Sequence, residues 1–152
     1  MTAPHTAVVD GVITVAALVV LDEAGRPLTA RQEGTERFML PGGKPEPGQT
    51  PARCASREAA EEVGMVVPAE SLLLLGAFTA AAANEPGHQV RSTVYAAPRD
   101  HGHPSWPAAA RGEVAEIRWL DLRSTLPDDL APLLRDAVVP GLPSLPAPGP
   151  RA

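Results

Sequence analysis

Residues Pro41–Met65, PGGKPEPGQTPARCASREAAEEVGM, join a stretch that is unable to form regular structure to a stretch with the pattern of a helix. The first nine residues hold three prolines and three glycines, which interrupt both helices and strands. A helix is predicted over Pro51–Val63, because Thr50 is a favourable N-cap, Pro51 suits the first helical position and Gly64 suits a left-handed stop. We therefore expect a glycine-rich loop that leads directly into the N-terminus of a helix.

Three glutamates of this helix, Glu58, Glu61 and Glu62, are related as i, i+3 and i+4 and project from one face. Like charges at this spacing destabilise a helix by roughly 0.2–0.5 kcal/mol per pair. A bound Mg²⁺ or Mn²⁺ would offset the repulsion, because both ions prefer compact sets of oxygen ligands and Mg²⁺ is often shared with substrate phosphates. The loop and helix thus predict a metal site for a phosphorylated substrate. Two alternatives stay open, a plainly solvated glutamate face and an acidic surface for a basic partner.

The stretch resembles the Nudix box, the signature of Nudix hydrolases. The positions that match its spacing are Gly43, Arg57, Glu58, Glu61, Glu62, Gly64 and Met65. Two positions depart from it, since Gln49 stands in the place of the first glutamate and Ala59 replaces a larger aliphatic residue. Gln49 keeps a hydrogen-bonding oxygen but lacks the charge, so its bond to Arg57 or to a metal-bound water is weaker. We expect reduced activity at worst, or a changed metal affinity, and not an inactive site.

The resemblance implies hydrolysis of a nucleoside diphosphate linked to another group, with Mg²⁺ or Mn²⁺ as cofactor. It gives Glu58, Glu61 and Glu62 the role of metal ligands, with the carbonyl oxygen of Gly42 as a further ligand. Arg57 would orient the carboxylates. In this scheme the metal neutralises the pyrophosphate and lowers the pKa of the water that attacks phosphorus.

Other site residues are predicted with less support from the pattern. Related enzymes often draw a general base from beyond the box. Glu113 is favoured over Glu116, and Glu62 is an alternative. Four residues are predicted to contact substrate: Arg31, Arg37, Lys44 and Asn84. The alternative is plain solvation for Arg31, Arg37 and Lys44, and a simple hairpin turn over Asn84–Gly87 for Asn84.

The rest of the chain predicts an α/β domain, and the resemblance implies a Nudix fold with a mixed β-sheet sandwiched between helices. The apolar run Ile13–Asp22 has the pattern of a strand buried on both faces, and it is expected to form a hairpin with Leu28–Gln32. Further strands are predicted over Arg37–Leu40, 71–83, 88–98 and 113–122, and a short helix over Asp128–Val138. The Nudix domain is predicted over residues 1–139, and the proline-rich segment 140–152 is expected to be a disordered tail.

Composition narrows the class of protein. The net charge of −5 argues against a broad basic face, and hence against a nucleic-acid partner. A single cysteine, Cys54, excludes an intrachain disulfide framework and fits a reducing compartment. No apolar run approaches the roughly 20 residues of a membrane span, so we expect a soluble cytoplasmic protein that does not bind membranes. A homodimer is left open.

The substrate is the least determined feature. A compact chain with a short region after the box is most similar to the MutT-like branch of the family. That branch converts nucleoside triphosphates, including oxidised ones, to a monophosphate and pyrophosphate. Aromatic residues make up only 3% of the chain, so few rings are available to stack on a base. Two alternatives are kept: a nucleotide-sugar or ADP-ribose pyrophosphatase, and a regulatory module that binds a nucleotide without hydrolysis.

Overall fold

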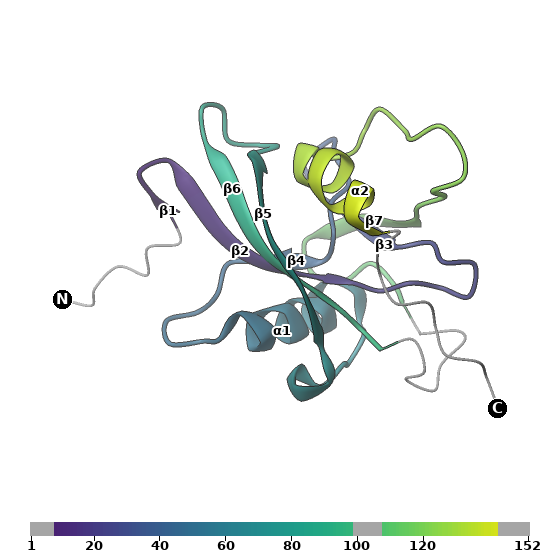
Figure 1. The fold of residues 1–152 in the computed structure, drawn as a ribbon, viewed down its shortest axis with the longest axis horizontal. Helices are drawn as coiled ribbons and strands as arrows, with labels where there is room; N and C mark the ends of the chain where they lie inside the picture. Colours follow the sequence, from purple (N-terminus) through teal and green to yellow (C-terminus); the bar gives the residue numbers. More distant parts are fainter. Residues whose placement is uncertain (1–7, 99–107, 143–152) are drawn as a thin grey trace.

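A mixed β-sheet with helical segments on both faces forms the centre of the molecule (Figure 1). The computed structural model describes residues 8–98 and 108–142. In chain order the elements are β1 (Val8–Val9), β2 (Val12–Val19), β3 (Leu28–Gln32), β4 (Gly42–Gly43), α1 (Pro51–Val63), η1 (Ala69–Ser71), β5 (Leu73–Ala81), β6 (Gln89–Ala96), β7 (Val114–Trp119), η2 (Leu133–Val138) and α2 (Val139–Gly141). The predicted fold class is confirmed.

The main sheet is built around β2. Its strands follow the order β1-β2-β6-β5, and β4 pairs with a further part of β2. β2 runs parallel to β6 from Val12 opposite Gln89 to Val19 opposite Ala96, and the other pairs are antiparallel. The near-continuous apolar run of β2 is buried because both faces of this strand are covered by other elements.

The predicted hairpin between the first long strand and Leu28–Gln32 forms only at its turn. There Asp22 N–H donates to the Arg26 carbonyl at 3.0 Å, Leu21 forms an antiparallel bridge with Pro27, and Leu28 N–H donates to the Val20 carbonyl at 2.9 Å. The rest of β3 pairs instead with β7 in a separate two-stranded sheet. Both edges of β2 are already used, one by β6 and the other by β1 and β4. The chain must therefore leave the main sheet after β2.

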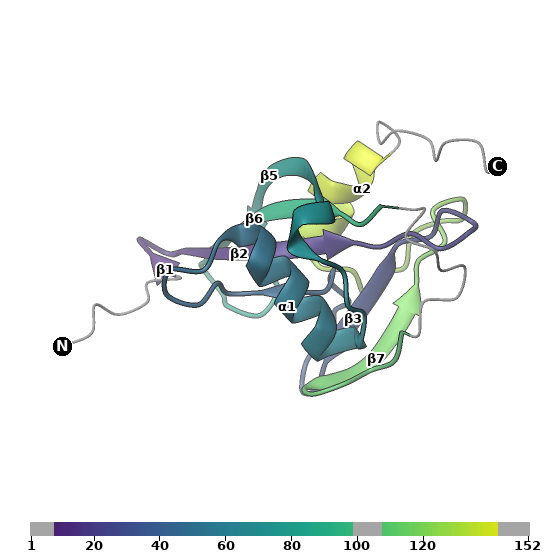
Figure 2. The same ribbon diagram turned by 90° about the horizontal axis from the view of Figure 1, so that it is seen from below.

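Helix α1 occupies the predicted residues and lies against one face of the main sheet (Figure 2). Thr50 caps its N-terminus through a bond from Arg53 N–H to Thr50 Oγ1 at 3.2 Å, and Gly64 ends it in the left-handed conformation at φ 73°. The small residues Ala55 and Ala59 are fully buried, together with Val63. This row lets the helix approach the sheet closely and turns its glutamates away from the core.

The opposite face is covered by η2 and α2, where Leu134 and Val138 pack with residues of β2 and β6. The predicted start of this helix at Asp128 is wrong. The residues that precede η2 pair with Phe38 instead. Phe38 N–H donates to the Asp129 carbonyl at 2.7 Å, and Ala131 N–H donates to the Phe38 carbonyl at 2.9 Å. The predicted strand Arg37–Leu40 is accordingly reduced to isolated bridges at Phe38 and Met39.

The antiparallel pair β5–β6 is joined at the predicted Asn84–Gly87 turn. Its strands are somewhat shorter than predicted, as is β7. The predicted domain boundary at 139 falls at the start of α2, and Leu142 beyond it is buried. Most of the predicted tail lies outside the described residues. Within 8–98 and 108–142, no helix is both long and apolar enough to cross a membrane.

Candidate active site

The two glycines of β4 bring the loop backbone against both the sheet and helix α1. A side chain on Gly42 would overlap Ala16 and Ala17 of β2, and one on Gly43 would overlap the carboxylate of Glu58. The buried Cys54 thiol donates to the Gly43 carbonyl at 3.3 Å, and burial raises the pKa of this thiol to about 11. At Gly42 the overlap is with backbone, so only glycine fits there, and at Gly43 any side chain would displace the Glu58 carboxylate. The loop is therefore held directly beside the glutamate face.

Glu62 is bound to the loop on one side and to β3 on the other. Its Oε1 accepts a hydrogen bond from Gly42 N–H at 3.0 Å, and its Oε2 accepts one from Gln32 Nε2 at 3.0 Å. Burial raises the pKa of Glu62 to about 7, although the bond from Gly42 opposes the shift. A carboxyl group that titrates near neutral pH in a desolvated position is a recognised feature of functional sites.

Glu58 lies next to Gly43 with its side chain only 14% exposed. Burial raises the pKa of this carboxyl, the nearby Arg57 lowers it, and Glu61 raises it further. Two desolvated carboxylates of α1 therefore lie against the Gly42–Gly43 segment, Glu58 beside Gly43 and Glu62 bonded to Gly42. Their raised pKa values mean that the charged forms lack sufficient compensation from the protein.

Arg57 connects the helix to the loop. It donates to Glu61 Oε1 at 3.0 Å, to the Lys44 carbonyl at 3.1 Å and to Gln49 Oε1 at 3.3 Å. Gln49 Oε1 also accepts from Glu46 N–H at 3.0 Å. Gln49 thus keeps a bond to the arginine at the place where the box has a glutamate, as a neutral acceptor.

The donor set fits a hard divalent cation. Within the described ranges, no three His, Cys, Asp or Glu side chains stand close enough together to hold a metal ion as they are now arranged. The reason is local, since Glu61 is ion-paired with Arg57 while Glu62 is bound by Gly42 and Gln32. Glu58 and Glu62 nevertheless supply crowded, desolvated oxygens beside the glycine loop, and a cation there would favour their charged forms.

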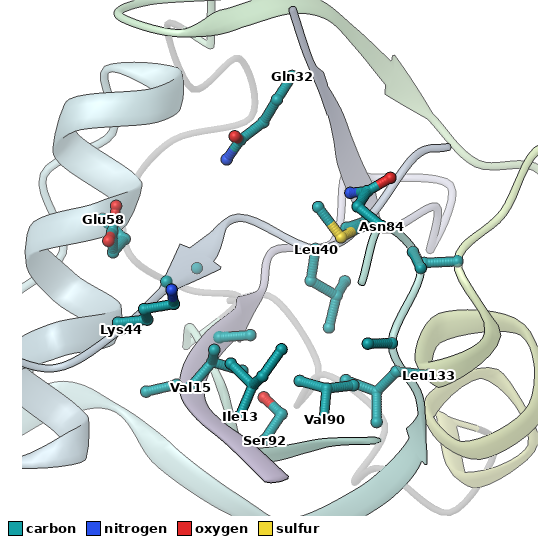
Figure 3. A pocket seen from close by; sticks show the side chains of 18 of the residues that line it. Ile13, Val15, Gln32, Leu40, Lys44, Glu58, Asn84, Val90, Ser92 and Leu133 are labelled. Atoms are coloured by element: carbon teal, nitrogen blue, oxygen red, sulfur yellow. The ribbon is translucent and has the colours of Figure 1, made fainter. Parts of the chain in front are cut away.

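A cleft of about 610 Å³ opens from this group of carboxylates into the space between the main sheet and η2 (Figure 3). Its charged end is lined by Glu58, Lys44, Glu113 and Arg57, and Gln32 also reaches it. Its inner end is lined by side chains that are mostly aliphatic: Ile13, Val15, Leu40, Val90, Leu133 and Leu134. Asn84 lies on the lining as well, at the turn between β5 and β6.

The structure brings some of the predicted residues to the cleft and leaves others away from it. Glu58, Arg57, Gly42, Lys44, Asn84 and Glu113 are lining residues. Glu61, Glu62, Glu116, Arg31 and Arg37 are not. Arg31 binds Glu116 and the Thr35 carbonyl, and Arg37 donates to the Leu130 carbonyl at 3.1 Å. A role in substrate binding for these two arginines stays a prediction.

Two residues of the site were not anticipated from the sequence, Gln32 and Ser92. Gln32 ends β3, where the register with β7 shifts between Arg31 and Gln32. Such an irregularity redirects a side chain, and nothing in the local sequence signals it. Ser92 carries only a weak signal, as a hydroxyl in an otherwise apolar alternation on β6.

Comparison with known protein families gives the identification. A family model described as the NUDIX domain matches residues 12–139. The chain belongs to the Nudix family. It is a Nudix hydrolase by membership, so the resemblance and the enzyme class predicted from the sequence are confirmed. Pyrophosphohydrolysis is the general activity of this family.

Solved Nudix structures share the fold. They include a MutT Nudix hydrolase from Burkholderia pseudomallei, with a TM-score of 0.65, 21% identity, and coverage of 88% of this chain and 97% of that chain. A MutT protein from Methanosarcina mazei Go1 gives a TM-score of 0.61 and 20% identity, and the match covers 90% of this chain and 94% of that chain. A MutT/nudix family protein from Enterococcus faecalis gives a TM-score of 0.57 and 23% identity, and the match covers 70% of this chain and 42% of that chain. No curated protein matches the sequence.

Proposed function

We propose that this Nudix hydrolase depends on Mg²⁺ or Mn²⁺ and cleaves a nucleoside diphosphate linked to another group. The simplest such substrate is a nucleoside triphosphate, which would give a monophosphate and pyrophosphate. The supporting observation is the division of the cleft into a charged end at Glu58 and Lys44 and an aliphatic inner end. A phosphate chain at the first and a nucleoside at the second match this division.

The residues of the charged end take distinct roles in the proposal. Glu58, Glu61, Glu62 and the Gly42 carbonyl would hold the cation, which requires Glu61 to leave its ion pair with Arg57. The bound cation would neutralise phosphate charge and lower the pKa of the attacking water. Arg57 orients the helix carboxylates, because it contacts both Glu61 and the loop.

Two further lining residues, Glu113 and Lys44, are assigned to proton transfer and to phosphate binding. Glu113 lies near enough to Glu58 to raise the pKa of that carboxyl, and we assign it as the base that accepts the proton of the water. Glu116 is a weaker candidate because it is paired with Arg31. Glu62 is the alternative base, since burial raises its pKa to about 7, close to the operating range of a general base. The Lys44 ammonium would bind phosphate oxygens as a point charge.

The test is product release from a panel of nucleoside triphosphates, oxidised nucleotides, nucleotide sugars and ADP-ribose, with Mg²⁺, with Mn²⁺ and with EDTA. We expect metal-dependent turnover of at least one nucleotide. The variant Glu62→Gln should lower kcat by orders of magnitude, because it removes a charged ligand or base and changes little in volume. Glu70→Gln, an exposed position on η1, is the matched control and should keep wild-type activity.

Each outcome selects one function. Preferred turnover of a nucleotide sugar or ADP-ribose would replace the triphosphate proposal. Metal-dependent nucleotide binding without turnover of any compound would favour the regulatory module. Equal activity of Glu62→Gln and the wild type would remove Glu62 from the mechanism.

A further inference from the structure

The Ser92 side chain is an exception in the aliphatic inner end of the cleft. β6 side chains alternate between two faces, and Val90, Ser92 and Val94 share one face. Val90 and Ser92 line the cleft, and Val94 belongs to the apolar core closed by η2 and α2. Ser92 stands opposite Val15 on β2 and Phe78 on β5 in the sheet register. It is 0% exposed, and Figure 3 shows it among Ile13, Val15 and Val90.

The hydroxyl of Ser92 has no hydrogen-bond partner in the described part of the chain. A buried hydroxyl without a partner lowers the free energy of unfolding by roughly 1–3 kcal/mol, and alanine at the same position would not carry this penalty. A polar atom of the substrate that enters the inner end would satisfy it. Ser92 is a lining residue, and because its hydroxyl is covered in the ligand-free protein, neighbouring side chains must shift for this bond to form.

The aliphatic walls around Ser92 restrict the kind of substrate group that can bind there. A hexose carries several hydroxyls, and each would need a partner on burial, but the inner end provides one buried hydroxyl among aliphatic side chains. A nucleobase has two apolar faces and a polar edge, which fits aliphatic walls and one hydrogen-bonding group. None of the described lining residues is aromatic, so stacking on a ring does not supply the selectivity.

We infer that Ser92 is a specificity-determining residue whose hydroxyl hydrogen-bonds the polar edge of a nucleobase held between the aliphatic walls of the cleft. The inference rests on the proposed function, in that it assigns the nucleoside to the inner end. The inference goes beyond the proposed function because it names the residue that distinguishes a base from a sugar.

The test uses ligands that separate the base from the rest of the molecule. Calorimetric titrations would compare the four common ribonucleoside monophosphates with ribose 5-phosphate, which has the sugar and phosphate but no base. We expect one monophosphate to bind wild-type protein at least about tenfold more tightly than ribose 5-phosphate. Ser92→Ala should weaken that monophosphate by about tenfold, the range of one buried hydrogen bond, and leave ribose 5-phosphate unchanged.

Two variants make the result specific. Thr93→Ala removes a hydroxyl from the neighbouring position on β6, which is not on the cleft lining, and should change neither affinity. Ser92→Thr restores a hydroxyl and should recover part of the affinity. The melting temperature of ligand-free Ser92→Ala should equal or exceed that of the wild type, whereas a purely structural role would lower it.

Three results would overturn the inference: an unchanged monophosphate affinity in Ser92→Ala, an equal loss for ribose 5-phosphate, or wild-type protein that binds ribose 5-phosphate as tightly as every monophosphate. The proposed function fails separately. If the monophosphates bind in the expected pattern and no triphosphate is hydrolysed, Ser92 keeps its role and the triphosphate proposal falls.

Discussion

At Glu62 the stability of the fold and the proposed function have opposite requirements, since the fold favours the protonated carboxyl and a metal ligand must be charged. Burial raises the pKa of Glu62 from 4.5 to about 7. Because the folded-state pKa is the higher one, the protonated form is favoured in the fold, and stability falls as the pH rises from about 4.5 through about 7. In EDTA, the free energy of unfolding should therefore be lower at pH 8 than at pH 5, by on the order of 2–3 kcal/mol from this group.

The variant Glu62→Gln isolates this effect. Its amide oxygen can still accept from Gly42 N–H, but it carries no charge at any pH. We expect the metal-free variant to be more stable than the wild type at pH 8 and similar to it at pH 5, as measured by urea denaturation. Parallel pH profiles for the two proteins would show that burial of Glu62 does not set the dependence.

At the scale of single elements, helix α1 was predictable because its signals are local. Thr50, Pro51 and Gly64 mark its ends, and its spacing places three glutamates on one face. The pairing of β3 was not predictable in this way, because it depends on which edges of β2 the distant β6 and β4 occupy. For the same reason the bond from Gln32 to Glu62, which spans 30 positions, has no sequence signal.

The contact of β4 with α1 fixes the position of the Glu58 carboxylate. Gly43→Ala places a methyl group where the Glu58 carboxylate lies, so either the loop or the glutamate must move. We expect kcat to fall by about 100-fold or more, since catalysis tolerates little displacement of its groups. Gly141→Ala, at a position with open space around the added carbon, is the control and should retain activity. Wild-type kcat in Gly43→Ala would mean that the position of Glu58 is not critical.

For the whole molecule, the sheet separates two apolar cores, one beneath α1 and one closed by η2 and α2. The second core also supplies Leu134 to the wall of the cleft, so its packing supports the inner end where the base is proposed to bind. Leu142, only 7% exposed, completes that core beyond the predicted boundary at 139.

Leu142→Ala should therefore lower the free energy of unfolding by about 2–3 kcal/mol, the lower part of the range for truncating a buried leucine. Val66→Ala, at a side chain that is 80% exposed, is the control and should change it by less than about 0.5 kcal/mol. Kinetics of the same variant would connect the core to the site. A looser wall at Leu134 should raise KM for the best nucleotide and leave kcat nearly unchanged, because the carboxylates lie on α1 across the sheet. An equal fall in kcat would instead indicate that the two cores are coupled through β2.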